Sequence, residues 1–388
     1  MTEDHIPTVT RQGLLTMMSA VRRTGILRAG VELRVFDAVA GAPAGPDEVA
    51  AFCGTDPRGM RILLNALAAT GLLVKDDDRF SLAPGADSTL VTTHPDYYGD
   101  AVRLAASDYE WDAIKRLGDA VRSGGSVMEV NAETPAYTFW EDFAALGTLN
   151  TPPIAELVAR HVLPGTKERD EVKVLDIACG HGLYGYTLAA HDPRARIWSL
   201  DWPNVLAVTE NNAERLGVRD RAHFIPGDMF EVPLGGPYDV VVVANVLHHF
   251  STERAKRLLA RTADAVRPGG QLVAIAISTG DGPPHLDPVP HLFSALMLAW
   301  TSQGQVHPSP TTRRWSPPPV SRHRRSTVSR TTRCACSSPT VSERCHGDHR
   351  ARVSRRQARA PGPRASRDRR LRGRSLERPQ HLRAGVRP

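Results

Sequence analysis

Residues 172–182 read VKVLDIACGHG, an apolar run that leads directly into a turn of small residues. The run from Val172 to Ile177 predicts a β-strand that is buried on both faces of a sheet. The turn at 178–182 is followed by a helical pattern from Leu183 to Ala190. A strand, a glycine-containing turn and a helix in this order form the nucleotide-sized crevice of α/β sheets. The segment therefore predicts an α/β fold with a nucleotide-like ligand at the turn.

An acidic residue, Asp201, ends the next predicted strand, Arg196 to Leu200. A carboxylate at this position can accept hydrogen bonds from both hydroxyls of a ribose. The turn at 178–182 fits neither the dinucleotide pattern GxGxxG nor the phosphate-binding pattern GxxxxGKS. These features favour a nucleoside that carries no phosphate, of which S-adenosylmethionine is the common example. The alternative is an ordinary strand–helix turn in another α/β protein.

Three more apolar segments follow, at 222–230, 238–250 and 266–278. They alternate with helical patterns at 203–217 and 252–266. Strands that alternate with helices predict successive βαβ units on a parallel, doubly wound sheet.

The order of these motifs resembles that of class I S-adenosylmethionine-dependent methyltransferases. More narrowly, residues 15–305 resemble the small-molecule O-methyltransferase family that plant phenolic and bacterial antibiotic-tailoring enzymes share. The resemblance implies a Rossmann-like methyltransferase sheet behind an N-terminal, mainly helical winged-helix domain. It also implies methyl transfer from S-adenosylmethionine to a hydroxyl of a small acceptor, which we expect to be an aromatic secondary metabolite.

The resemblance also implies which residues bind the cofactor. The methionine-side turn corresponds to Asp176, Gly180 and Gly182, and the ribose carboxylate to Asp201. Asp228 and Met229 in the sequence GDMF flank the adenine, with the carboxylate toward its amino edge and the thioether on its face. The full cofactor-binding set is Asp176, Gly180, Gly182, Asp201, Asp228 and Met229.

His248 stands where the family places its catalytic histidine, and it is our candidate general base. A phenol has a pKa near 10, and its anion is the better nucleophile, so a neutral imidazole within reach can assist by taking the proton. The family usually writes this motif His-Asp-Trp, whereas this chain has His248-His249-Phe250. The departure leaves C- or N-methylation of a small aromatic open. We expect the side chain of His249 to face another way.

Aromatic residues are frequent in the helical segment at 101–160, which includes PAYTFWEDFA. This run resembles a segment that lines the acceptor pocket in bacterial family members. Phe139 and Trp140, together with Met297, are therefore our candidate acceptor-binding residues. The alternative is that these side chains only pack in a core.

The 388 residues provide enough chain for two domains and a large core. The sequence contains no run of 18 apolar residues, so no membrane helix is predicted. The N-terminus lacks the apolar core of a secretion signal, so secretion is not expected. Five unevenly spaced cysteines predict no disulfide framework, so a reducing, cytoplasmic setting is expected. Residues 301–388 carry 22 arginines and four acidic residues, a net charge of +18, which leaves −11 for residues 1–300 of the total of +7.

Residues 17–100 predict a small winged-helix domain. Its three helices and its hairpin are expected near 26–39, 46–53, 56–70 and 72–82. Winged helices commonly bind DNA, but phosphate contacts need a basic face. The three aspartates at 76–78 and the negative charge of residues 1–300 argue against a nucleic acid partner. In the resembled family this module dimerises, so we expect a homodimer.

Beyond about residue 305 arginine, proline, serine, alanine and histidine dominate, and apolar periodicity ends. One interpretation is a disordered basic tail. We favour a frameshift between about 300 and 315, because a GC-rich gene read out of frame yields arginine without lysine. The closing strands and the carboxylate partner of His248 would then be missing, which leaves an inactive family member as an alternative. The cysteines and histidines of the tail match no standard zinc spacing, so no metal is expected.

These observations divide the chain into four parts. They are a winged-helix dimerisation domain at 1–100, a helical connector that lines the acceptor pocket at 101–170, the S-adenosylmethionine-binding domain at 171–305, and the arginine-rich tail at 306–388.

Overall fold

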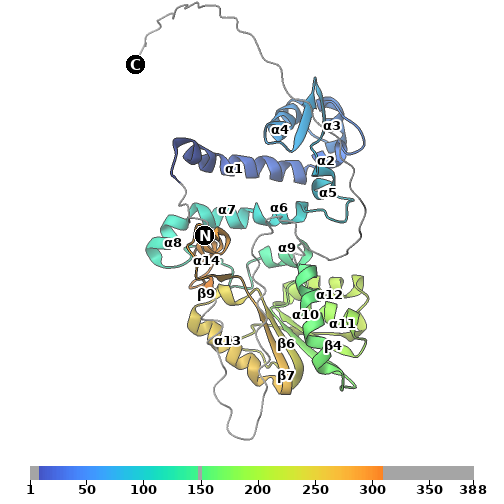
Figure 1. Ribbon diagram of the computed structural model, residues 1–388, viewed down its shortest axis with the longest axis vertical. Helices are drawn as coiled ribbons and strands as arrows, with labels where there is room; N and C mark the ends of the chain where they lie inside the picture. Colours follow the sequence, from blue (N-terminus) through green and yellow to red (C-terminus); the bar gives the residue numbers. More distant parts are fainter. Residues whose placement is uncertain (1–7, 147–150, 309–388) are drawn as a thin grey trace, which may run out of the picture. The chain divides into compact units, whose positions relative to one another are not determined.

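A five-stranded parallel sheet forms the centre of the domain that follows residue 170 (Figure 1). The computed structural model describes residues 8–146 and 151–308 of the chain. The strands are β3 (Val172–Ile177), β4 (Ala195–Asp201), β5 (Ala222–Pro226), β6 (Tyr238–Ala244) and β7 (Val266–Ile275). Their spatial order is β5-β4-β3-β6-β7. From β3 the chain adds β4 and β5 on one side, and it then crosses over to add β6 and β7 on the other side of β3. This doubly wound topology confirms the predicted fold class.

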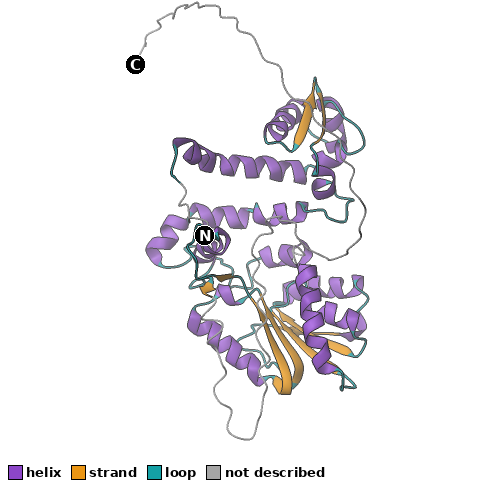
Figure 2. Cartoon of the chain, viewed as in Figure 1, coloured by secondary structure: helices purple, strands orange, loops and turns teal. Residues whose placement is uncertain are grey.

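Helices cover both faces of the sheet (Figure 2). Val240 and Val242 of β6 pack in one core cluster, whereas Val241 and Val243 pack in a second cluster on the other face. Because β6 is covered on both sides, all seven of its residues are buried, which explains its run of four valines. The first cluster contains residues of α10 (Thr151–Val162), α11 (Leu183–His191) and α12 (Pro203–Arg215), and the second contains residues of α13 (Thr252–Asp264).

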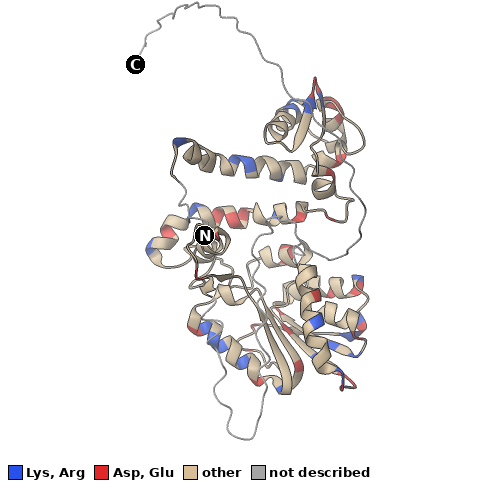
Figure 3. Ribbon diagram, viewed as in Figure 1, with Lys and Arg blue, Asp and Glu red and all other residues tan. Residues whose placement is uncertain are grey.

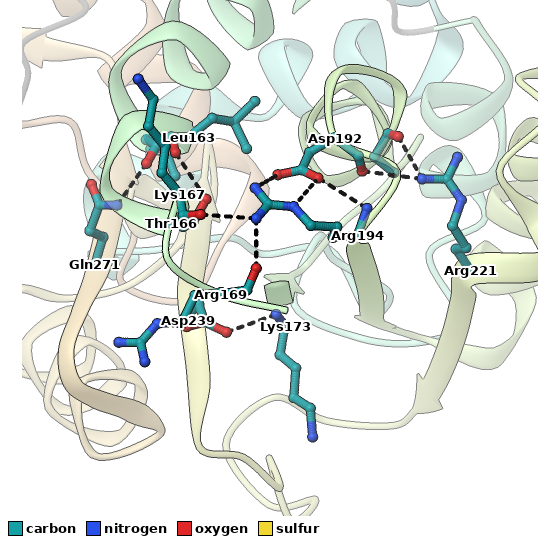
Figure 4. Close-up of polar contacts among 12 residues, drawn as sticks. Leu163, Thr166, Lys167, Arg169, Lys173, Asp192, Arg194, Arg221, Asp239 and Gln271 are labelled. Atoms are coloured by element: carbon teal, nitrogen blue, oxygen red, sulfur yellow. Dashed lines mark hydrogen bonds and ion pairs between the residues drawn. The ribbon is translucent and has the colours of Figure 1, made fainter. Parts of the chain in front are cut away.

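Polar side chains tie together the amino-terminal ends of the strands (Figure 4). The carboxylate of Asp239 accepts hydrogen bonds from the Lys173 amide at 2.9 Å and from the Arg267 guanidinium at 2.6 Å. The Arg194 guanidinium donates to the carbonyl of Arg169 at 2.6 Å. These contacts join β3, β4, β6 and β7 at one edge. The loops that follow the carboxyl ends of the strands, where α/β sheets bind ligands, lie at the opposite edge.

The last strand of the sheet is irregular. Its pairing with β6 shifts register between Tyr238 and Val240. A Cβ atom at Gly270 would lie 2.8 Å from the carbonyl oxygen of Asp239, so only glycine allows the two backbones to approach this closely. The register shift and this close approach place Pro268, Gly269 and Gly270 in a bulge inside β7.

Within the described residues, β7 pairs only with β6 and forms one edge of the sheet, and β5 forms the other. Two short strands, β8 (Ser278–Thr279) and β9 (His307–Pro308), pair with each other. The arginine-rich tail beyond residue 308 lies outside the described residues. The frameshift and the missing closing strands therefore stay predictions.

The N-terminal domain contains the helices and the hairpin of the predicted winged helix. Its elements are α1 (Arg11–Glu32), α2 (Val35–Ala38), α3 (Pro46–Cys53), α4 (Pro57–Ala69), β1 (Leu73–Asp76), β2 (Arg79–Leu82) and α5 (Ala86–Leu90). The single helix expected at 26–39 is instead divided, because Arg34 adopts the left-handed region with a φ of 57°. This bend directs α2 so that the carboxylate of Asp37 accepts the backbone N–H of Thr92 at 3.0 Å.

Basic and acidic residues lie close together on the ribbon around the wing (Figure 3). Arg61 lies 2.9 Å from the carboxylate of Asp78, and Arg79 lies 3.1 Å from that of Glu48. These ion pairs offset the positive charge that phosphate contacts would use. The exclusion of a nucleic acid partner remains a prediction from charge.

The connector forms a second helical layer with α14. Its helices are α6 (Gly99–Ala105), α7 (Asp108–Lys115), α8 (Leu117–Ser123) and α9 (Phe139–Leu146), and α14 spans Pro288–Trp300. Side chains from α7, α8, α9 and α14 share one hydrophobic cluster that is rich in aromatic rings. In the part of the chain that is described, no helix is both long and apolar enough to cross a membrane.

Candidate functional site

The turn after β3 has a backbone that few residues can adopt. Ala178, Gly180 and Gly182 all have positive φ, at 51°, 52° and 76°. At Gly182 a Cβ atom would lie 2.3 Å from the Tyr186 ring, so a side chain there is excluded. The turn therefore brings bare backbone to the carboxyl edge of the sheet, immediately before α11.

Asp201 fastens this turn to the end of β4. One oxygen of its carboxylate accepts the Gly180 N–H at 2.8 Å, and the other accepts the Trp202 N–H at 2.8 Å. A carboxylate has about four acceptor positions, so capacity remains for the hydroxyls of a ribose. Burial raises the pKa of Asp201 to about 6.

Asp176, at the end of β3, has one unused acceptor. Its Oδ2 accepts the Gly185 N–H at 3.0 Å, whereas its buried Oδ1 has no hydrogen-bond partner among the described residues. Burial, assisted by the nearby charge of Asp201, raises the pKa of Asp176 to about 7. An orphaned buried oxygen is costly unless a ligand satisfies it. The two carboxylates and the glycine turn thus fit a nucleoside with donor groups at both ends, as S-adenosylmethionine has.

Asp228 and Met229 lie in the loop that follows β5. The Asp228 carboxylate accepts the Phe230 N–H at 2.8 Å, which fixes the loop. The partly buried side chain of Met229 packs against the core cluster that contains Leu200 of β4. The structure therefore places both residues at the same carboxyl edge as Asp201. Their contacts with adenine stay a prediction.

His248 and His249 lie in the short 3-10 turn Leu247–His249 after β6. Both side chains are buried, and their ring centroids are 4.6 Å apart. The Nδ1 atom of each ring has no hydrogen-bond partner in the part of the chain that is described. The expected carboxylate partner of His248 is therefore not found between residues 8 and 308 outside the gap at 147–150.

Burial keeps both imidazoles neutral. It lowers the pKa of His248 well below the ordinary value, and the neighbouring His249 and His307 lower it further. Burial alone lowers the pKa of His249 to about 4. A neutral imidazole is the form that can accept a proton, although a low pKa reduces the driving force for the transfer.

The two histidines face different aromatic neighbours. The ring of His248 meets Phe293 of α14 edge-on at 4.9 Å, and the ring of His249 meets Trp140 of α9 at 5.1 Å. The pair therefore lies where the connector and α14 meet the cofactor domain. His249 does face differently from His248, but it faces the predicted acceptor residue Trp140 rather than leaving the site.

The acceptor candidates occupy the aromatic cluster to different degrees. Trp140 is partly exposed, and its indole N–H donates to the Ala132 carbonyl at 2.9 Å. Phe139 is only 4% exposed, and Met297 has no exposed surface. Core packing thus covers the whole surface of Met297 and most of the surface of Phe139. Their role in binding an acceptor stays a prediction. A cavity of about 450 Å³ adjoins the same cluster beside Tyr137.

Two further aromatic residues, Phe143 and Phe293, contact the site and were not among the predicted acceptor-binding residues. Phe143 stacks on His181 of the cofactor turn with centroids 5.8 Å apart. A signal was available, because Phe139 and Phe143, like Phe293 and Met297, are four residues apart and share a helix face. Among the described residues no cluster of three metal-ligating side chains occurs.

The sheet, the turn and the carboxylates define a class I S-adenosylmethionine-dependent methyltransferase. Residues 174–270 match the family model of a methyltransferase domain, and residues 15–92 match that of an O-methyltransferase dimerisation domain. A Nostoc punctiforme protein whose crystal structure is assigned as an O-methyltransferase is 31% identical. The match has a TM-score of 0.71 and covers 79% of this chain and 92% of that one. The chain therefore belongs to the S-adenosylmethionine-dependent O-methyltransferases, and S-adenosylmethionine is its cofactor.

Two similar proteins come from Streptomyces species. The tetracenomycin polyketide synthesis 8-O-methyl transferase TcmO of Streptomyces glaucescens is 29% identical over 263 residues, 67% of this chain and 76% of that protein. The N,N-dimethyltransferase OxyT of Streptomyces rimosus is 27% identical over 282 residues, 70% of this chain and 80% of that protein. This chain is thus similar to enzymes that methylate oxygen and to one that methylates nitrogen.

Proposed function

We propose that this enzyme methylates a hydroxyl of a small aromatic secondary metabolite and that His248 is the general base. The observation that carries the proposal is the neutral, buried His248 in the turn after β6, beside the aromatic ring of Phe293. The similarity to TcmO supports oxygen as the methylated atom and a polyketide as the kind of acceptor.

The reaction needs alignment more than activation. S-adenosylmethionine, when bound, supplies a methyl group on a positively charged sulfur that is ready for displacement. The chain supplies the cofactor carboxylates Asp176 and Asp201, aromatic surface from Trp140 and Phe293, and a proton acceptor. Removal of the phenol proton by His248 as the new bond forms is expected to contribute ~10²–10⁴-fold to the rate.

The test is an assay of the full chain with labelled cofactor and a panel of naphthols and hydroxybenzoates. His248→Ala should lower kcat by ~10²–10⁴-fold and leave the affinity for S-adenosylhomocysteine, measured by calorimetry, within about twofold. His161→Ala, which alters an exposed histidine of α10, is the matched control and should behave as wild type. Normal turnover by His248→Ala would reject this histidine as the base.

N-methylation is the second candidate, because the chain is similar to OxyT and lacks the Asp-Trp that follows the family histidine. An amine needs less help from a base than a phenol, since its neutral form is already nucleophilic. An aminophenol acceptor separates the two functions. Mass spectrometry of the product should find the methyl group on oxygen, and a methyl group on nitrogen would favour the second candidate.

We also propose a homodimer through the N-terminal domain, which matches a dimerisation model. The first half of α1 exposes Leu14, Leu15, Met17, Met18 and Val21, and a second copy of the chain would cover them. Light scattering should give twice the chain mass for the wild type and the chain mass for the double variant Met18→Glu, Val21→Glu. The cytoplasmic location expected from the sequence stays a prediction.

A further inference from the structure

An ion pair connects the two halves of the site across 121 residues of sequence. Glu133, in the loop before α9, accepts a hydrogen bond from the Arg254 guanidinium at 2.9 Å. Its other carboxylate oxygen accepts the backbone N–H of Ser302 at 2.7 Å. The Glu133 side chain is only 10% exposed, so both of its carboxylate oxygens are hydrogen-bonded largely away from solvent.

Arg254 in turn lies on the cofactor side. Its guanidinium is 4.5 Å from the ring centre of Phe230 and 4.9 Å from that of Phe250. Phe230 directly follows the adenine candidate Met229, and Phe250 directly follows the histidine pair. The two rings also meet edge-on at 5.0 Å. One planar cation thus packs against both cofactor-side loops, an arrangement that lysine could not reproduce.

Glu133 is held within the acceptor side. The preceding residue, Ala132, donates its N–H to the carbonyl of Trp300 at 3.0 Å and accepts the indole N–H of Trp140 at 2.9 Å. The loop that contains Ser302 then passes so close to the histidine turn that a Cβ at Gly304 would lie 2.7 Å from the His248 carbonyl oxygen. Movement of this loop would therefore be felt at the backbone of His248.

We propose that Glu133 and Arg254 form a positioning pair that sets the acceptor wall against the catalytic turn. The pair touches neither the predicted reacting atoms nor the cofactor carboxylates, so its role is to hold Trp140 and His248 in register. This inference rests on the proposed function, because it assigns the pair to the same methyl transfer. It predicts an effect on the transfer step that is separate from cofactor binding and from global stability.

The expected size follows from the geometry. Although Glu133 is only 10% exposed, Arg254 is 40% exposed, and water on the arginine side limits the contribution of the pair to stability. Misplacement of reacting groups by about 1 Å, however, can cost up to ~100-fold in rate. Loss of the pair should therefore lower kcat by about tenfold while the thermal midpoint changes little.

The experiment uses the full chain and compares Glu133→Gln, Arg254→Met and the double variant. Each is assayed with the best phenol from the panel described above. S-adenosylhomocysteine binding is measured by calorimetry, and the thermal midpoint by thermal unfolding. Glu156→Gln is the matched control, because it breaks an exposed pair with His191 at a similar distance of 2.8 Å, between α10 and α11. Hydrogen exchange of the peptide that spans residues 300–306 reports the loop without any acceptor.

We expect both single variants to lower kcat by about tenfold, the double variant to be no worse than either, and S-adenosylhomocysteine affinity to stay within about twofold. Exchange at 300–306 should rise in these variants and not in Glu156→Gln. Unchanged kcat and exchange would overturn the proposal. The proposal would also be overturned if the losses of kcat in the two single variants multiplied in the double variant. The same holds if thermal stability and S-adenosylhomocysteine affinity fell as much as kcat.

Failure of the proposed function has a different signature. If His248→Ala keeps its turnover, the base is wrong, yet the coupling between Glu133 and Arg254 is still measured on the same reaction and on hydrogen exchange. If His248→Ala loses turnover and the pair shows no coupling, only the positioning role is wrong.

Discussion

The cofactor half and the proposed acceptor half of this site are built in different ways. The cofactor half uses turns directly after β3 and β4, where Asp201 holds the Gly180 backbone at 2.8 Å. The acceptor half uses side chains from α9, α14 and the loops beside them, and its rings meet at centroid distances of about 5–6 Å. The first is fastened by directional hydrogen bonds close to the sheet. The second is held by packing between segments that are distant in sequence.

This difference has a consequence for substitution. A hydrogen-bonded turn on a buried strand admits one backbone path, so its residues are specified individually. An aromatic cluster is satisfied by shape and volume, so many sequences can build it. In the cofactor half, substitutions that change a single hydrogen-bonding atom should therefore impair binding. In the acceptor half, substitutions that remove side-chain volume should have the larger effect.

The largest effect on binding is expected at the ribose carboxylate. Asp201→Asn removes a charged acceptor and puts an amide where the Gly180 and Trp202 N–H groups now donate. The affinity for S-adenosylhomocysteine should fall by about a hundredfold, measured by calorimetry. Asp220→Asn, on an exposed carboxylate, is the control. A loss below about threefold would contradict the ribose assignment.

The acceptor half should respond separately. Trp140→Ala removes the ring beside His249 and its hydrogen bond to Ala132, and should lower kcat/KM for the phenol by about tenfold. S-adenosylhomocysteine affinity should stay unchanged, because Trp140 contacts none of the cofactor carboxylates. An equal loss of cofactor affinity would mean that the two halves are not separable.

A smaller effect concerns the pH dependence of turnover. Because the pKa of His248 lies well below the ordinary value, the imidazole is already neutral at mildly acidic pH. The kcat of the wild type should vary by less than about twofold between pH 5.5 and 7.5, measured with saturating substrates. An acid limb with a midpoint near 6.5 would indicate that His248 titrates like an exposed histidine.

The smallest effect concerns stability. The pKa of Asp176 is raised to about 7 in the folded protein, above its value of about 3.9 in the unfolded chain. The contribution of the Asp176 carboxyl to the free energy of unfolding is fully present below about pH 4. It is lost as the pH rises toward 7, because this carboxyl ionises at lower pH in the unfolded chain than in the folded protein. The thermal midpoint without cofactor should therefore fall more between pH 5 and 8 in wild type than in Asp176→Asn. Parallel curves would show that Asp176 is not the source.

Much of the fold was predictable because its signals are local. The strand at 172–177, the glycine turn and the helices and hairpin of the N-terminal domain follow from short-range patterns, and the structure places them near the expected positions. The apolar segment expected at 238–250 forms a strand only over 238–244. The divided first helix was not predictable, because arginine rarely adopts positive φ and the contact of α2 with Thr92 joins residues 55 positions apart in the sequence. The bulge at Gly270 likewise depends on the neighbouring strand.

The site divides in the same manner. The residues themselves indicate a nucleoside and, by resemblance, a methyl donor, because Asp176 and Asp201 lie at the ends of two strands, and Gly180 and Gly182 lie in the turn after the first. Which ring faces Trp140, which faces Phe293, and that Glu133 reaches Arg254 were decided only by the tertiary structure. The physical reason is that a turn on a strand is specified by its own backbone. Contacts between remote helices and loops depend instead on how whole elements pack, and no short stretch of sequence contains that information.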